Sequence, residues 1–195
     1  MATETTFESR TNHSSPDANL SGRWRVISER SRVGFRVKKM GLYHVKGRFR
    51  AVAGTVELGP GESSAEIVID ASSVTTRMPP RDLHLRSADF LDAKTHPVIA
   101  VSAGAVEAGP DGELRVPATF EIRGRRAEIE LTGHFHGGDG DDLVLHLGGQ
   151  LDRHEFGIRA RQPFEMVVGR RVELDAELAL EPAGSGVAGD LGDMG

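Results

Sequence analysis

Apolar and polar residues alternate along most of the chain, as they do in β-strands that bury one face. Alternation is clearest over residues 32–38, 114–122, 126–136, 142–151 and 172–180, and shorter candidates lie at 23–27, 65–70 and 97–103. Only "RGR", residues 123–125, separates the second and third of the long segments, which predicts a β-hairpin there. The sequence therefore predicts about eight antiparallel strands and almost no helix.

The segment 45–58, "VKGRFRAVAGTVEL", changes its apolar phase within one candidate strand. Val45 is odd-numbered and Val56 is even-numbered, with Gly54 between them. A bulge or bend near Gly54 would let one long strand turn a corner, as closure of a sheet requires. This segment favours a closed barrel over a two-sheet sandwich.

The apolar face of these strands mixes bulky and small residues. The bulky residues expected to line the lumen are Phe35, Val37, Phe49, Ile129, Phe135 and Leu145. The small residues expected to leave room beside them are Gly47, Ala51, Ala118, Ala127 and Gly133. A barrel of about eight strands is either filled by its own side chains or holds one small ligand. Both alternatives stay open on the pattern alone, and a ligand in such a lumen would be apolar.

Composition and charge narrow the classes of function. The 195 residues suffice for one domain, expected over 23–182, between a disordered tail at 1–22 and a flexible glycine-rich tail at 183–195. The 24 Lys and Arg against 29 Asp and Glu give a formal charge of −5, which argues against a nucleic-acid partner. Without cysteine the chain has neither disulfides nor thiol nucleophiles. The sequence shows no secretory signal and no apolar run of about 18 residues, so we expect a cytoplasmic protein without an integral membrane segment.

Residues 81–97, "RDLHLRSADFLDAKTHP", concentrate acids, bases and apolar side chains in one short run. Such a run is compatible with catalysis, with a metal site, or with a polar plug that closes one end of a folded shell. Pro79 and Pro80 are expected to end the preceding strand, and Asp82 is a candidate N-cap of a short helical segment. Leu85 would face inward while the charged residues bond to one another and to strand ends. These features favour the plug.

The same run resembles the YceI-like, or polyisoprenoid-binding, family. The residues that fall on the family pattern "RDxHLRSxDFxDxxxxP" are Arg81, Asp82, His84, Leu85, Arg86, Ser87, Asp89, Phe90, Asp92 and Pro97. Supporting motifs are "GFRVKKMGLYHVKGRF" (34–49), "SSVTT" (72–76), "IRG" (122–124) and "DRHEFGI" (152–158), and the similarity covers about residues 24–180. The resemblance implies an all-β, lipocalin-like antiparallel β-barrel with a long apolar pocket and one short helical segment near residues 81–91.

The resemblance also implies a class of ligand, an isoprenoid-like or fatty amphiphilic small molecule that the barrel binds, transports or stores. The residues expected to contact it are Phe35, Val37, Phe49, Arg81, Asp82, His84, Leu85, Phe90, Ile129, Phe135, Leu145 and Phe156. No catalytic residue, metal or cofactor is expected. Many members carry histidine where this chain has Lys39, which bears on the preference for a polar head group. A homodimer is left open.

Other functions rest on few residues. His134 and His136 share the predicted solvent face with glutamates and lack the strict spacing of metal ligands. Ser87 has His84 and Asp89 nearby in the sequence, but the chain contains no "GxSxG" elbow and no glycine-rich nucleotide loop. The basic run at 36–50 alternates with apolar residues, as on a solvated strand face. The remaining alternatives are a hydrolase or transferase acting on a lipid-like substrate, and a stress or assembly protein with a filled barrel.

Overall fold

The computed structural model describes residues 21–59, 63–104, 106–109, 112–137, 142–159 and 167–184. The strands are β1 (Gly22–Val26), β2 (Arg32–Lys39), β3 (Tyr43–Phe49), β4 (Val52–Leu58), β5 (Ser64–Asp70), β6 (Val98–Ala103), β7 (Glu107–Ala108), β8 (Leu114–Ile122), β9 (Arg125–Gly137), β10 (Leu143–Asp152) and β11 (Val168–Pro182). The helical elements are the 3-10 turns η1 (Ser28–Arg30) and η2 (Ala71–Ser73) and one α-helix, α1 (Pro79–Arg86). The predicted tails fall almost entirely on residues outside these ranges, so the domain boundaries stay a prediction.

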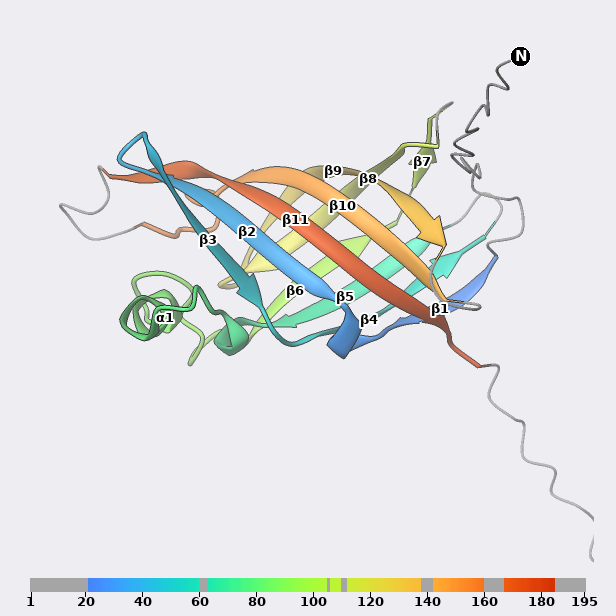
Figure 1. Ribbon diagram of the computed structural model, residues 1–195, viewed down its shortest axis with the longest axis horizontal. Coiled ribbons are helices and arrows are strands. Elements are labelled where there is room, and N and C mark those ends of the chain that lie inside the picture. Colours follow the sequence, from blue (N-terminus) through green and yellow to red (C-terminus); the bar gives the residue numbers. More distant parts are fainter. Residues whose placement is uncertain are drawn as a thin grey trace, which may run out of the picture.

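The strands form a closed antiparallel barrel, which confirms the predicted fold class (Figure 1). Its order is β1-β4-β5-β6-β8-β9-β10-β11, and β1 pairs with β11 to close the ring. The β2–β3 hairpin continues the sheet from β11, because β2 pairs with the N-terminal part of this long strand and β1 with its C-terminal end. The hairpin and α1 lie at the same end of the molecule (Figure 1).

The corner predicted near Gly54 lies elsewhere. Residues 45–58 are not one bulged strand: β3 ends at Phe49, β4 begins at Val52, and the β4–β5 register runs without interruption through Gly54. The chain changes partners at Arg50 and Ala51, whose backbone N–H groups donate to the Ser73 hydroxyl at 3.1 and 3.2 Å. A side chain from η2 therefore holds the corner, and this contact has no signature in the periodicity of the segment.

The β8–β9 hairpin at residues 123–125 is confirmed. Arg123 and Gly124 have φ angles of 55° and 69°, and Ile122 pairs with Arg125 across the turn. Positive φ at both central residues is the geometry of the two-residue turns that match the twist of β-strands. The Arg123 side chain also donates to the carbonyls of Ala88 and Gly157, both at 3.0 Å, and so ties this turn to two neighbouring loops.

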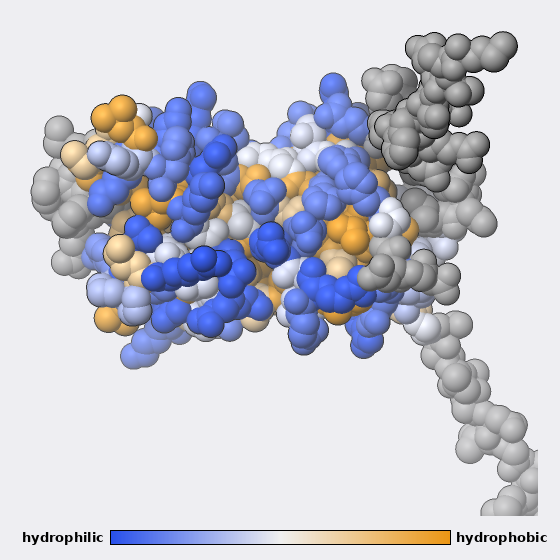
Figure 2. Space-filling model, viewed as in Figure 1, coloured by the Kyte–Doolittle hydropathy of each residue, from blue (hydrophilic) through white to orange (hydrophobic). Residues whose placement is uncertain are grey.

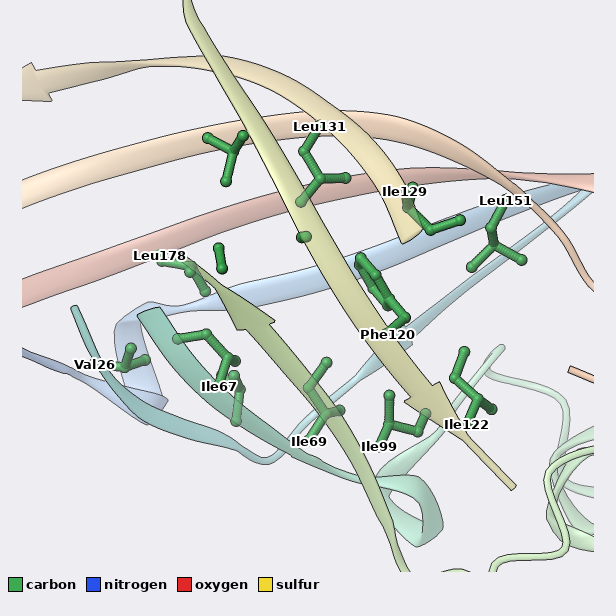
Figure 3. Packing of buried hydrophobic residues seen from close by; sticks show 14 of the residues in the cluster. Val26, Ile67, Ile69, Ile99, Phe120, Ile122, Ile129, Leu131, Leu151 and Leu178 are labelled. Carbon is green, nitrogen blue, oxygen red and sulfur yellow. The ribbon is translucent and has the colours of Figure 1, made fainter. Parts of the chain in front are cut away.

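The predicted apolar faces meet inside the barrel, where they form one continuous core (Figure 3). Two of the small residues on these faces do not leave free volume. A Cβ on Gly47 would lie 2.2 Å from Cζ of Phe35, so the phenyl ring already occupies that space. A Cβ on Gly133 would lie 1.8 Å from the carbonyl oxygen of His146, because the β9 and β10 backbones approach closely there. Glycine at these positions permits packing and close strand approach.

Candidate ligand-binding site

An apolar cavity of about 370 Å³ occupies the end of the barrel between the β2–β3 hairpin and α1. Its hydrocarbon wall comes from β2, β3, β5, β6, β8, β10, β11, α1 and the loops beside them: Val33, Phe35, Val37, Val45, Phe49, Ile69, Val74, Met78, Leu85, Phe90, Leu91, Ile99, Phe120, Ile122, Leu151, Ile158, Val168, Val172 and Leu174. Cavities of this size hold small-molecule ligands. The wall itself selects for a hydrocarbon chain.

The ionisable residues of the lining, among those the structure describes, are all basic: Lys38, Lys39, Arg81, His84 and Arg153. Lys38 and Lys39 are exposed at the end of β2. His84 lies on α1, with its Nε2 atom 3.4 Å from a carboxylate oxygen of Asp89 and its ring edge-on to Phe90. The site thus combines an apolar interior with nitrogen donors.

Partly buried hydrogen bonds fix α1 against the barrel end, and the buried Asp82 is their centre. Its carboxylate, in a residue that is 6% exposed, accepts from the Thr76 backbone N–H at 2.7 Å, from the Thr75 hydroxyl at 3.0 Å and from the Thr76 hydroxyl. Arg81 donates to the Thr76 hydroxyl at 2.7 Å and to the Thr76 carbonyl at 3.2 Å, and Arg86 donates to the carbonyl of Val74 at 2.8 Å. This network supports the wall of the cavity.

Asp82 is not the helix N-cap that the sequence predicts. The helix begins four residues earlier than that assignment requires, with Met78 as N-cap and Pro79 and Pro80 in its first turn. Proline suits these positions, because its fixed φ is helical and its missing N–H would have no partner in the helix. The prolines therefore start the helix rather than end a strand, and the Asp82 carboxylate turns back to the "SSVTT" segment before it.

Burial alone raises the pKa of Asp82, but the hydrogen bonds from Thr76 and Thr75 and the nearby Arg86 guanidinium together lower that pKa below its ordinary value. A second carboxylate behaves alike: the backbone N–H of His154 lowers the pKa of Asp152, and an ion pair with Arg170 adds to this, although burial opposes both. Both groups are therefore most stabilising when ionised.

The free energy of unfolding should fall in acid. Because both pKa values are lower in the folded than in the unfolded chain, their stabilisation is complete above pH of about 4, the ordinary aspartate value, and is lost as the pH falls through the lowered folded values. Urea unfolding between neutral pH and about pH 2.5 measures this loss. The free energy of unfolding of Asp82→Asn should fall less steeply below pH of about 4 than that of the wild type. If the two proteins lose stability equally with falling pH, Asp82 is not one of the groups responsible.

A second support for the cavity comes from the turn after β10. Arg153, which is 3% exposed, donates to the carbonyls of Ile158 at 2.7 Å, Val168 at 2.9 Å and Gly169 at 3.0 Å. It thereby joins the turn to the start of β11. Phe156, in the same "DRHEFGI" motif, is completely buried and does not line the cavity.

The structure distributes the predicted ligand contacts along the barrel. Those that line the cavity are Phe35, Val37, Phe49, Arg81, His84, Leu85 and Phe90. Phe135 and Leu145 line a separate cavity of about 50 Å³, together with Ala118. Asp82, Ile129 and Phe156 are buried but line neither cavity. The barrel therefore does not enclose one continuous lumen. It has a large cavity at the α1 end, and the rest of its interior is largely packed.

Several lining residues were not predicted. Phe120 and Ile122 belong to the apolar phase of β8 and Val172 and Leu174 to that of β11, so the pattern placed them inside without showing that they lie at the cavity end. Arg153 could have been predicted as a lining residue, because it lies within the "DRHEFGI" motif that supports the family resemblance.

The other candidate chemistries lack the necessary geometry. The Ser87 hydroxyl donates to the backbone carbonyl of His84 at 2.7 Å and so does not form a nucleophile–base pair with its ring. His134, His136 and His146 pack ring against ring on β9 and β10, with centroids 4.4 to 5.5 Å apart. Within the described ranges, no group of three or more His, Asp or Glu side chains is arranged to hold a metal ion. No helix in those ranges is both long and apolar enough to cross a membrane.

Residues 24–180 match the family model of the YceI-like domain. The chain belongs to the YceI-like family. A UPF0312 protein of Vibrio cholerae is 28% identical over 157 residues, which cover 76% of this chain and 79% of the relative. The YceI-like barrel is also seen in the crystal structure of Burkholderia cenocepacia BcnA, which has a TM-score of 0.72 and 19% identity over 79% of this chain and 98% of that one. A polyisoprenoid binding domain from Saccharophagus degradans has a TM-score of 0.67 and 18% identity, and the match covers 82% of this chain and 98% of that domain's chain.

Proposed function

We propose that this YceI-like protein binds an amphiphilic, isoprenoid-type lipid, with the hydrocarbon tail in the 370 Å³ cavity and the head group beside its basic residues, and that it carries or stores this lipid. The observation that supports the proposal best is the cavity itself, which is walled by hydrocarbon and carries nitrogen donors. The structural neighbour described as a polyisoprenoid binding domain adds to this support.

The free energy available from the tail is large. Each methylene buried in such a cavity contributes about 0.8 kcal/mol, so four of them correspond to a factor of roughly 200 in affinity. An empty apolar cavity leaves its lining atoms without van der Waals partners. A bound lipid therefore stabilises the protein and is expected to persist through purification.

The head group is set by the basic residues. Lys38, Lys39 and His84 offer N–H donors, and an acceptor-rich or anionic head group would satisfy them. We propose carriage rather than catalysis, since the Ser87 hydroxyl donates to a backbone carbonyl and the buried Asp82 carboxylate already accepts from three donors. The cytoplasmic location remains a prediction.

Titration with a fluorescent geranylgeranyl probe tests this function. We expect saturable binding with one site per chain, displaced by geranylgeraniol and geranylgeranyl phosphate but not by short alcohols. Absence of saturable binding by delipidated, folded protein would overturn the proposal. Binding followed by chemical change of the probe, detected by mass spectrometry, would favour the enzyme.

Lys39→Glu should discriminate between head groups. Loss of one charge-assisted hydrogen bond costs about 1.5 to 3 kcal/mol, so the affinity for geranylgeranyl phosphate should fall at least tenfold while that for geranylgeraniol changes little. The matched control is Lys46→Glu, on β3 outside the cavity lining, which should alter neither affinity. Equal losses for both lipids would mean that Lys39 does not contact the head group.

A further inference from the structure

Large apolar side chains are exposed at the end of the barrel that holds the cavity. Met40, Leu42 and Tyr43, in and beside the β2–β3 turn, are 62%, 81% and 67% exposed. Met78 and Leu83, at the start of α1 and within it, are 50% and 71% exposed. Met78 lines the cavity, and Lys38 and Lys39 of the lining lead directly into the turn.

These exposed side chains lie at one end of the barrel (Figure 1), and we call Met40, Leu42, Tyr43, Met78 and Leu83 the mouth surface. Figure 1 shows the β2–β3 turn and α1 at the same end of the barrel, and Figure 2 shows orange side chains among blue ones at that end. The other large apolar residues exposed within the described chain are Val68 and Val98, on β5 and β6. Clustered apolar exposure of this kind marks a surface that another phase or molecule covers.

The charge around the mouth surface is positive although the protein is acidic. From Ser31 to Thr55 the sequence contains no Asp or Glu, and it carries Arg32, Arg36, Lys38, Lys39, Lys46, Arg48 and Arg50. Of these, Arg36 is paired with Glu173 of β11. Because the whole chain has a formal charge of −5, this basic hairpin is a local feature and not a consequence of composition.

We propose that the mouth surface docks on an anionic lipid membrane, with the β2–β3 turn and α1 entering the interface, so that the cavity exchanges its lipid directly with the bilayer. Apolar side chains ringed by lysine and arginine are what interfacial binding requires, and tyrosine favours the boundary between head groups and acyl chains. Each lysine or arginine near an anionic surface adds attraction. A lipid leaving through this end would not have to cross water.

A second copy of the chain fits this surface less well. Two copies that met through their mouth surfaces would bring the basic residues of β2 and β3 face to face, and like charges in contact are unfavourable. An anionic bilayer instead complements them. Charge complementarity therefore selects the membrane over a homodimer.

Co-sedimentation with vesicles tests the docking. Ligand-free protein is mixed with phosphatidylcholine vesicles that contain or lack phosphatidylglycerol, at low and at high salt. We expect binding to the anionic vesicles, weakened by salt and by omission of phosphatidylglycerol. Leu42→Ser with Tyr43→Ser should weaken that binding at least tenfold, while the matched control Val68→Ser, an exposed apolar residue on the barrel wall, should leave it unchanged.

A second pair of variants tests the contribution of positive charge to membrane binding. Lys46→Glu, at an exposed position of β3, should weaken binding to anionic vesicles fivefold or more, since each basic residue near such a surface is worth about 1 kcal/mol. Arg115→Glu, at an exposed position of β8 outside both cavities, should not. Titration of the same variants with the geranylgeranyl probe without vesicles should match wild type, which separates docking from lipid binding. The proposal would be overturned if the protein showed no preference for anionic vesicles, or if the double variant bound them like wild type. It would also be overturned if the only effect of the double variant were loss of a homodimer in sedimentation velocity.

Discussion

Replacing Val37 by Trp is expected to abolish uptake of a long prenyl probe while the barrel stays folded. Val37 of β2 pairs with Val45 of β3 and Val172 of β11, and all three side chains line the cavity. An indole at the centre of this row would lie across the space that the ligand tail needs. Displacing as few as two methylenes costs about 1.6 kcal/mol, which already exceeds tenfold in affinity, and we expect a larger loss.

The matched control for Val37→Trp enlarges a side chain at the other end of the barrel. Leu147 lines the separate 50 Å³ cavity, and Leu147→Phe should cost about 1 to 3 kcal/mol of stability through overpacking while probe affinity is kept. Fluorescence titration measures affinity and urea unfolding measures stability. If Val37→Trp binds the probe as wild type does, the ligand does not occupy this cavity.

Replacing Asp82 by Ala is expected to lower the free energy of unfolding by roughly 2 to 4 kcal/mol. The carboxylate is buried and accepts from both Thr75 and Thr76, so its removal leaves these half-buried donors without their acceptor and takes away the negative charge near Arg86. The loss should exceed that of Asp82→Asn, which keeps one acceptor oxygen. Chemical unfolding at neutral pH measures both.

Asp89→Ala serves as the control for Asp82→Ala. Its carboxylate is 3.4 Å from His84, and its side chain retains 22% exposure whereas Asp82 is buried, so its removal should cost less than that of Asp82. A barrel that unfolds as wild type does without Asp82 would contradict the structural role of the network. A catalytic role would then gain support only if turnover of a lipid disappeared with it.

The choice of a barrel over a sandwich rested on a corner expected near Gly54, which lies at Arg50 and Ala51 instead, and on the family resemblance. Alternation along the strands was enough to predict the antiparallel strands and their apolar faces, because the face on which a side chain lies follows from its parity in the strand. It does not show how far along the barrel axis a residue lies. Phe35 and Phe135 belong to the same inward set, yet they line different cavities. That depth depends on strand tilt and register, which are set by pairing between distant segments.

Long-range contacts account for the other differences. The corner at Arg50 and Ala51 is held by Ser73, and Asp82 bonds back to Thr75 and Thr76, so neither can be seen within its own segment. Proline at the start of α1 did carry a local signal, because the first helical positions tolerate a missing N–H. The motif resemblance supplied what the periodicity lacked, namely a short helical segment near residues 81–91 in an otherwise all-β fold.

Native mass spectrometry of the protein as purified, followed by organic extraction and lipid mass analysis, tests the central claim most directly. The account predicts a chain that carries one amphiphile with a long hydrocarbon tail, and an extract that contains this lipid in a ratio near one to one. Val37→Trp, purified in parallel, should carry none. A wild-type chain that shows only its own mass, yields no lipid on extraction and takes up no prenyl compound afterwards would contradict the account.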